Sequence, residues 1–349
     1  MRLRGAAALL AGLAGCSSWR GVPDAELPAQ PVAIYYRTSE QAQQRADSYQ
    51  ADRAAEAPPD GSPTLVGSKA LLRADMGPLG EFLSNAFGTD RGRREAQRGR
   101  LALLDPRSGQ VDVVEGALRG SVPLAWKPDH EHLLFAQSPA PESSDVQIFE
   151  WSASADTVRR VTVGPPIHSQ ACYGPDERIV VTAVDTSGGV PASRIRISQP
   201  GGRGPYTDLS SGPADHSPTC APDGSAVAFA RAGEGMRSEI WLVVAPFGAA
   251  PRALAPGRHP RFARGGWLVY TATRGRAQHL FRVRADGSGR APIGEGARDE
   301  AWPSASPDGR LVAYVATEDA PRSRLLVRRF DGSGDRILLS SGEGEYPVW

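Results

Sequence analysis

The chain has 349 residues and a net charge of +1, so no overall field would draw it to nucleic acid or to acidic membranes. Its 39 glycines and 30 prolines indicate frequent turns, and 40% hydrophobic residues are enough for a packed core. Three cysteines are too few for a disulfide scaffold and lack metal-finger spacing.

Residues 1–15 have the pattern of an export signal. Two arginines give a positive start, and the apolar run that follows is too short to span a bilayer. The run ends in Leu-Ala-Gly-Cys at Cys16, which resembles a bacterial lipobox. The resemblance implies cleavage before Cys16 and lipidation of its thiol, and the following Ser17 implies sorting to the outer membrane. The alternative is an ordinary signal peptide with an incidental cysteine.

Residues 16–61 are predicted to form a lipidated tether with one short strand and one helix. Pro31–Arg37 is rich in β-branched and aromatic residues, which favours a strand. Ser39–Ala57 is rich in helix formers, and Ser39 is the expected N-cap. Because the apolar face of this helix is thin, it is either a surface spacer or a docking helix for a partner.

From residue 62 to 349 the chain is organised around a recurring turn and strand. Pro222-Asp223-Gly224 is typical of a tight turn, and the apolar run behind it is typical of a strand. The unit returns at Pro307, and weaker copies begin at Pro128, Pro175 and Gly265. Pro128, Pro175 and Pro222 are 47 residues apart, which is a period typical of propeller blades.

Six expected hairpins alternate with these units, at residues 100–114, 148–156, 194–202, 239–248, 280–289 and 325–334. They predict an all-β, six-bladed propeller of four-stranded antiparallel blades. The last residues, 345–349, resemble the opening of another repeat. An open ring would leave unpaired strand edges, so we expect this tail to pack against the first blade and close the ring.

A predicted surface insertion interrupts the pattern between residues 76 and 97. Five arginines cluster at its end: Arg91, Arg93, Arg94, Arg98 and Arg100. They form either a solvated loop or a site for an anion such as phosphate or a lipid headgroup.

The repeat over residues 62–349 resembles the TolB-type propeller family, whose units read Pro-x-Trp-Ser-Pro-Asp-Gly before a short strand. The match is sharpest at residues 218–229 and 303–314. The resemblance implies the fold, whereas propellers of one fold carry many unrelated activities. The tryptophan position of the unit varies, which predicts varied packing between blades. Its residues are Trp126, Cys172, Cys220, Phe262 and Ala305.

Three histidines, His168, His216 and His259, occupy similar places in consecutive units, near the expected central channel. Converging imidazoles would offer ligands to a divalent metal, as in propeller lyases of similar fold that act on pectic fragments. The alternative is that each histidine hydrogen-bonds the backbone of the neighbouring blade. We adopt the second reading and predict no metal or cofactor. Glu300 and Glu345 are expected to make the channel mouth polar.

Cys172 and Cys220 lie at the same point of consecutive units. Export permits a disulfide between them, and the alternative is two small buried side chains that pack between blades. A disulfide requires Cα atoms within about 7 Å, so the distance between the two strands decides whether the bond can form.

The sequence contains no Gly-x-Ser-x-Gly, His-Glu-x-x-His or phosphate-loop motif. We therefore expect a non-enzymatic, lipid-anchored propeller on the periplasmic face of the outer membrane. It would bind an envelope protein or glycan through the funnel mouth or the arginine cluster, and no nucleic acid. The alternatives are a metal-dependent, sugar-directed enzyme that uses the channel histidines, and a sensor or assembly scaffold without a small ligand.

Overall fold

A computed structural model describes residues 21–56, 99–138, 145–187, 192–233, 237–294, 298–317 and 322–349 of the chain. The expected export signal, Cys16, and the arginines at 91, 93, 94 and 98 lie outside these residues. In the described part, no helix is both long enough and apolar enough to cross a membrane.

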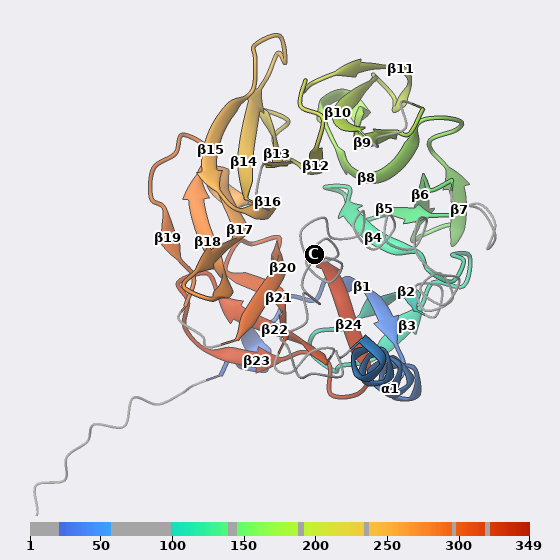
Figure 1. Ribbon diagram of the computed structural model, residues 1–349, viewed down its shortest axis with the longest axis vertical. Coiled ribbons are helices and arrows are strands. Elements are labelled where there is room, and N and C mark those ends of the chain that lie inside the picture. The colour runs from blue at the N-terminus through green and yellow to red at the C-terminus, as the bar shows by residue number, and fades with distance from the viewer. Residues whose placement is uncertain are drawn as a thin grey trace, which may run out of the picture.

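The described strands form six four-stranded antiparallel sheets around a central axis, which confirms the predicted six-bladed propeller (Figure 1). Blade I consists of β24 (Glu343–Val348), β1 (Val32–Arg37), β2 (Arg100–Leu104) and β3 (Val111–Val113). Blade II consists of β4 (Val122–Trp126), β5 (His132–Gln137), β6 (Gln147–Ser152) and β7 (Thr157–Arg160). Blade III consists of β8 (Ile167–Tyr173), β9 (Ile179–Asp185), β10 (Ala192–Gln199) and β11 (Arg203–Asp208).

Blade IV consists of β12 (Asp215–Cys220), β13 (Ala226–Ala232), β14 (Ser238–Val244) and β15 (Arg252–Pro256). Blade V consists of β16 (Arg258–Ala263), β17 (Trp267–Arg274), β18 (Ala277–Arg284) and β19 (Ala291–Pro292). Blade VI consists of β20 (Asp299–Ala305), β21 (Leu311–Thr317), β22 (Ser323–Arg329) and β23 (Asp335–Ile337). The first strand named in each blade contacts its counterparts in the adjacent blades, so these six strands surround the axis. Short 3-10 turns lie at Asp24–Glu26, Pro175–Glu177 and Arg264–Gly266.

The ring is closed within blade I by strands from opposite ends of the chain. β24 pairs antiparallel with β1, with Tyr35 opposite Glu345, so the expected contact of the tail with the first blade is confirmed. The sequence predicts that Pro31–Arg37 belongs to the tether and that the propeller starts at residue 62. The structure corrects this boundary, because the apolar side chains of β1 are fully buried inside the blade and β1 also pairs with β2.

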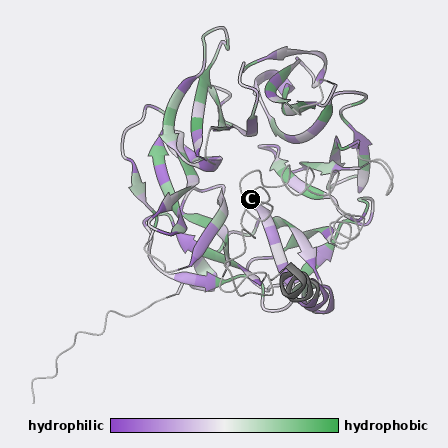
Figure 2. Ribbon diagram, in the orientation of Figure 1, coloured by the Kyte–Doolittle hydropathy of each residue, from purple (hydrophilic) through white to green (hydrophobic). Residues whose placement is uncertain are grey.

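Neighbouring blades pack face to face, and the apolar cores lie between them. Figure 2 shows hydrophobic residues along the strands all around the ring. One core cluster joins Val32 and Ile34 of blade I to Val327 of blade VI, and another joins Ile195 of blade III to Phe229 of blade IV. Because each sheet is covered on both faces, its central strands are continuous apolar runs, which is the pattern that the sequence shows after each Pro-Asp turn.

The Pro-Asp-Gly turns form as predicted. The Asp223 carboxylate accepts a hydrogen bond from the backbone N–H of Ser225 at 3.0 Å, and Gly224 has a φ of +72°. A Cβ added at Gly224 would lie 2.8 Å from the Cβ of Pro175, which belongs to the turn of blade III. Glycine is therefore needed both for the left-handed backbone and for the close approach of the two turns.

Gly224→Ala is expected to lower the free energy of unfolding by about 2 kcal/mol, because a left-handed residue other than glycine is strained and Pro175 is crowded. Gly275→Ala is the matched control, since Gly275 also has a positive φ (+66°) but a Cβ there would meet nothing within 4 Å. Urea unfolding of both variants measures the difference. Equal losses would contradict a contribution from the contact between turns.

Helix α1 (Ser39–Glu56) follows β1 and lies beside β24 in Figure 1. Its N-cap is Thr38 and not the expected Ser39. The backbone N–H of Gln41 donates to Thr38 Oγ1 at 3.4 Å and that of Thr38 donates to Gln41 Oε1 at 3.0 Å, which is a capping box. The Ser39 hydroxyl accepts a hydrogen bond from the Gly342 N–H at 3.0 Å, so the start of the helix is attached to the chain just before β24.

Candidate ligand-binding funnel

The strands around the axis are bulged, and the bulged residues close the central channel. Ser217, His259, Trp302 and Tyr346 each have a φ near +50°, and the pairing register of their strands shifts at these residues. Together with Leu124 they line a cavity of only about 30 Å³. The Trp302 ring lies 4.5 Å from that of Tyr346 and 5.9 Å from that of His259, measured between centroids. At this level the channel is filled by side chains.

The three candidate histidines take different positions. His259 is a bulged residue that lines the channel, whereas His168 and His216 precede the bulge and are buried outside this lining. His168 Nδ1 lies 3.1 Å from Gln147 Oε1, so its partner in the neighbouring blade is a side chain and not the expected backbone group. His216 Nδ1 lies 3.0 Å from Ser217 Oγ.

Burial keeps these imidazoles neutral at physiological pH. It lowers the pKa of His168 and of His216 to about 4, and that of His259 well below its usual range. Among the residues that the structure describes, no three histidine, cysteine, aspartate or glutamate side chains are placed to hold a metal ion. The arrangement gives no support to the metalloenzyme alternative.

Next to the closed channel lies an open cavity of about 600 Å³, which we call the funnel. The ends of the axial strands and the Pro-Asp turns form its wall. The variation at the tryptophan position of the repeat predicts varied packing between blades. The structure places that position at the funnel wall and also in the apolar cores between blades, where Cys172 packs against blade IV and Ala305 against blade V. The residues at this position are Trp126, Cys172, Cys220, Phe262, Ala305 and, in blade I, Trp349.

Arg261 lies between the closed channel and the funnel, since it lines both cavities. Its Nη1 donates a hydrogen bond of 3.0 Å to the carbonyl oxygen of Leu124, across the axis from blade V to blade II. Burial lowers the pKa of Arg261 to about 10, so the guanidinium is charged at neutral pH. In the described parts of the chain, no ion pair joins Arg261 to a carboxylate. Arg261 is not predicted as a site residue from the sequence, because an arginine that occurs in a single repeat carries no periodic signal.

Cys172 and Cys220 form a disulfide across the funnel wall, with their Cα atoms 5.7 Å apart. The bond joins the axial strands β8 and β12, and therefore links blade III directly to blade IV. It closes a segment with a sequence separation of 48 residues.

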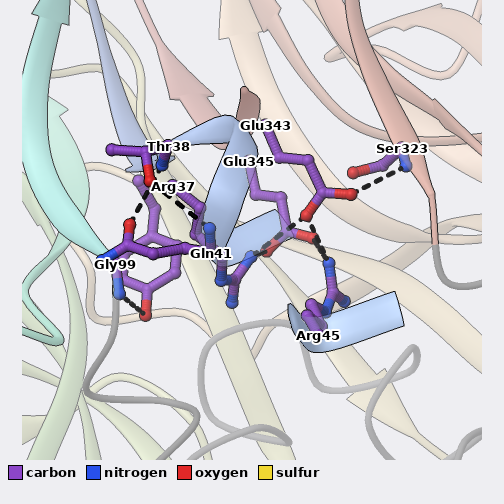
Figure 3. A network of polar contacts seen from close by, with 9 residues as sticks. Arg37, Thr38, Gln41, Arg45, Gly99, Ser323, Glu343 and Glu345 are labelled. Atoms are coloured by element: carbon purple, nitrogen blue, oxygen red, sulfur yellow. Dashed lines mark hydrogen bonds and ion pairs between the residues drawn. The ribbon is translucent and has the colours of Figure 1, made fainter. Parts of the chain in front are cut away.

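Two glutamates and two arginines form a buried network near α1 (Figure 3). Glu345 lies 2.7 Å from Arg37 and 2.8 Å from Arg45 of the helix, and Glu343 lies 3.0 Å from Arg45. Burial alone would raise the pKa of Glu345, but the two arginines outweigh it and hold this pKa at about 2. For Glu343 burial prevails and raises the pKa. The helix is thus attached to its own propeller through charge pairs on the axial strand β24.

Two further predicted residues lie elsewhere than expected. Glu300 is not at the channel mouth: it is buried between blades V and VI, where it pairs with Arg328 at 2.7 Å and accepts a hydrogen bond from the Leu280 N–H. Alternate residues of a strand point to opposite faces of the sheet, which explains why Glu300 lies between the blades and not at the channel mouth. Arg100, expected in the loop cluster, is in strand β2 and pairs with Glu115 at 3.1 Å.

No protein-family model matches the chain, and no curated protein matches it. Among solved structures, TolB from Acinetobacter baumannii aligns with a TM-score of 0.63 and 16% identity, over 92% of this chain and 66% of that chain. A putative TolB from Agrobacterium tumefaciens aligns with a TM-score of 0.57 and 21% identity, over 69% of this chain and 89% of that chain. Hydrazine synthase from Kuenenia stuttgartiensis aligns with a TM-score of 0.60 and 12% identity, over 92% of this chain and 46% of that chain.

These similarities define the class of the protein as a six-bladed β-propeller. More particularly, the fold is that of TolB-like propellers, which confirms for the fold the resemblance seen in the Pro-Asp repeat. Identities of 12–21% establish a shared fold only, and the structures that share it include an enzyme.

Proposed function

We propose that this chain is a non-catalytic propeller of the cell envelope that binds a protein or a glycan in its funnel. The funnel itself is the observation that carries the proposal. It is a concave cavity of about 600 Å³, closed at the channel, with walls that differ from blade to blade. Such a cavity suits one asymmetric ligand.

The described lining of the funnel contains no side-chain hydroxyl or thiol hydrogen-bonded to a histidine, which a nucleophilic enzyme would need. Its two cysteines are joined to each other. These features favour binding over catalysis as the role of the site.

Position-specific photo-crosslinking in intact cells tests this function. A photoreactive amino acid at Phe262, on the funnel wall, is expected to give one or a few discrete adducts. The same amino acid at Val163, which is 73% exposed and outside the funnel lining, is expected to give none of them. Identical adduct patterns at both positions, or no adduct at Phe262, would argue against a funnel ligand.

We further propose that a lipid on Cys16 anchors the propeller to the periplasmic face of the outer membrane. The support is the lipobox-like end of the export signal and the non-acidic residue that follows it. Several acyl chains on one residue would hold the chain stably, because each buried CH₂ contributes about 0.8 kcal/mol.

Cys16→Ser is therefore expected to abolish labelling with radioactive palmitate in a Gram-negative host and to move the protein from the membrane fraction to the soluble periplasmic fraction. Ser17→Ala serves as the matched control and keeps both label and membrane association. A Cys16→Ser protein that still sediments with membranes would exclude the lipid anchor.

A further inference from the structure

The floor of the funnel carries a charge where the other blades carry none. Arg261 directly precedes the tryptophan position of its repeat unit. The equivalent residues of the other blades are small, apolar or hydroxylated: Ala125, Ala171, Thr219, Ser304 and Val348. Five of the six blades close without an arginine at this place, so the repeat itself does not require one; in blade V the side chain also bonds the Leu124 carbonyl oxygen across the axis.

Two hydroxyl groups lie at the same level in the blades on either side of Arg261. Thr219 Oγ1 accepts a hydrogen bond from the Phe262 N–H at 3.1 Å, and Ser304 Oγ accepts one from the Trp349 N–H at 2.9 Å. In both cases the backbone bond fixes the oxygen and leaves the hydroxyl hydrogen to be donated. Three adjacent axial strands therefore present one guanidinium and two O–H donors to the same cavity.

The charges around this floor favour an anion. Lys127 and Arg264 also line the funnel, with Lys127 paired to Glu177 at 3.0 Å, and Asp223 has the single acidic side chain of the described lining. The Asp223 carboxylate is engaged in its own turn, where it accepts hydrogen bonds from the Ser225 N–H at 3.0 Å and from the Ser225 hydroxyl at 2.6 Å. A partly buried guanidinium without a carboxylate is stabilised when an incoming carboxylate supplies charge-assisted hydrogen bonds.

The rest of the lining favours a peptide over a sugar. Trp126 and Phe262 are only partly buried and give aromatic surface, and the described lining contains no glutamate, asparagine or glutamine. A sugar presents many hydroxyl groups that need such acceptors, whereas a peptide can place an apolar side chain on the wall. The channel beyond Arg261 is closed, so a chain end or a single side chain enters and a continuous strand does not pass through.

We propose that the funnel binds an extended peptide segment whose carboxylate, at the chain end or on an acidic side chain, is held by Arg261 together with the Thr219 and Ser304 hydroxyls. This inference rests on the proposed binding function and specifies its ligand. The two sources of the carboxylate share one chemistry, and the experiment separates them.

The test uses the purified full-length protein, immobilised in detergent, and a tryptic digest of cell-envelope proteins as the probe. Retained peptides are identified by mass spectrometry, before and after methyl esterification of all carboxyl groups in the digest. Wild-type protein is expected to retain a defined subset of the peptides. Methyl esterification is expected to reduce the retained amount of these peptides at least about 10-fold, as is typical when one partner of a buried charge pair is removed. Retention that esterification does not change would overturn the proposal.

Arg261→Met should reduce retention of the same subset by a similar factor. Arg276→Met is the matched control, because it removes an arginine that is exposed and lies outside the funnel. Arg261→Lys keeps the positive charge but lacks the paired N–H donors of the guanidinium. Its retention of the peptides should lie between that of Arg261→Met and that of the Arg276→Met control. Melting temperatures show whether each variant is folded, and the esterification arm with wild-type protein does not depend on any of them. Unchanged retention by folded Arg261→Met would refute the role of this residue.

Resynthesised peptides then locate the carboxylate. Loss of binding on C-terminal amidation identifies the chain end, and loss on Asp→Asn or Glu→Gln substitution identifies a side chain; either result supports the proposal. Retention of acidic oligosaccharides instead of peptides would overturn it while leaving the broader binding function intact. Crosslinked adducts at Phe262, combined with peptide retention that does not depend on a carboxylate, would likewise overturn the proposal and leave the broader binding function intact.

Discussion

Glu345→Gln is expected to lower the free energy of unfolding by about 3–5 kcal/mol, the cost of removing one partner from a buried charge pair. Glu345 is 2% exposed and lies within 2.8 Å of both Arg37 and Arg45, so the neutral amide leaves two positive charges with weaker compensation. The lowered pKa of Glu345 has the same sign, because the two arginines favour the ionised carboxylate in the folded protein. Urea unfolding at pH 7 measures the loss.

The same carboxylate predicts how stability depends on pH. Its pKa is lower in the folded protein than in the unfolded chain, so its contribution is complete above about pH 5 and is lost as the pH falls towards 2. The difference in stability between wild type and Glu345→Gln should therefore shrink over that window. Glu26→Gln is the control, because Glu26 pairs with Arg329 on the surface and should leave stability nearly unchanged. A constant difference from pH 7 to pH 2 would contradict the assignment.

Replacing both Cys172 and Cys220 with alanine is expected to lower the free energy of unfolding by about 4 kcal/mol. The estimate follows from the chain entropy that a disulfide with a sequence separation of 48 residues removes from the unfolded state. Alanine is chosen because both positions are at least partly buried beside apolar neighbours. Urea unfolding without reductant measures the loss in the double variant.

Reduction supplies a control without mutation. Reductant should lower the stability of wild-type protein towards that of the double variant and should leave the variant unchanged. Thiol titration of denatured, unreduced protein should find neither cysteine free. Equal stability of the oxidised protein, the reduced protein and the double variant would show that the bond contributes nothing.

The fold could be predicted from the sequence because it is repetitive. Each Pro-Asp turn, such as Pro222-Asp223-Gly224, carries its own local signal, and repeats of about the same spacing reinforce one another. Ring closure was only half predictable. The tail resembled a repeat opening, but its partner Val32–Arg37 pairs with it from about 300 residues away and carries no repeat signal. The boundary at residue 62 was wrong for that reason.

The site was harder to predict than the fold. His259 lies three residues before its tryptophan position, and His168 and His216 lie four before theirs. In a bulged strand this difference of one residue in spacing decides whether a side chain enters the channel. The three histidines therefore do not converge. Arg261 departs from the repeat instead of following it. A search for residues that break the pattern near the axis would have found it.

The pairing of β24 with β1 also affects when the protein can finish folding. The innermost strand of blade I is made last, so this blade stays incomplete until the final residues have emerged from the ribosome. The pairing of β24 with β1 spans about 300 residues, whereas the strands of each other blade are neighbours in sequence, so blade I is expected to be completed after the others.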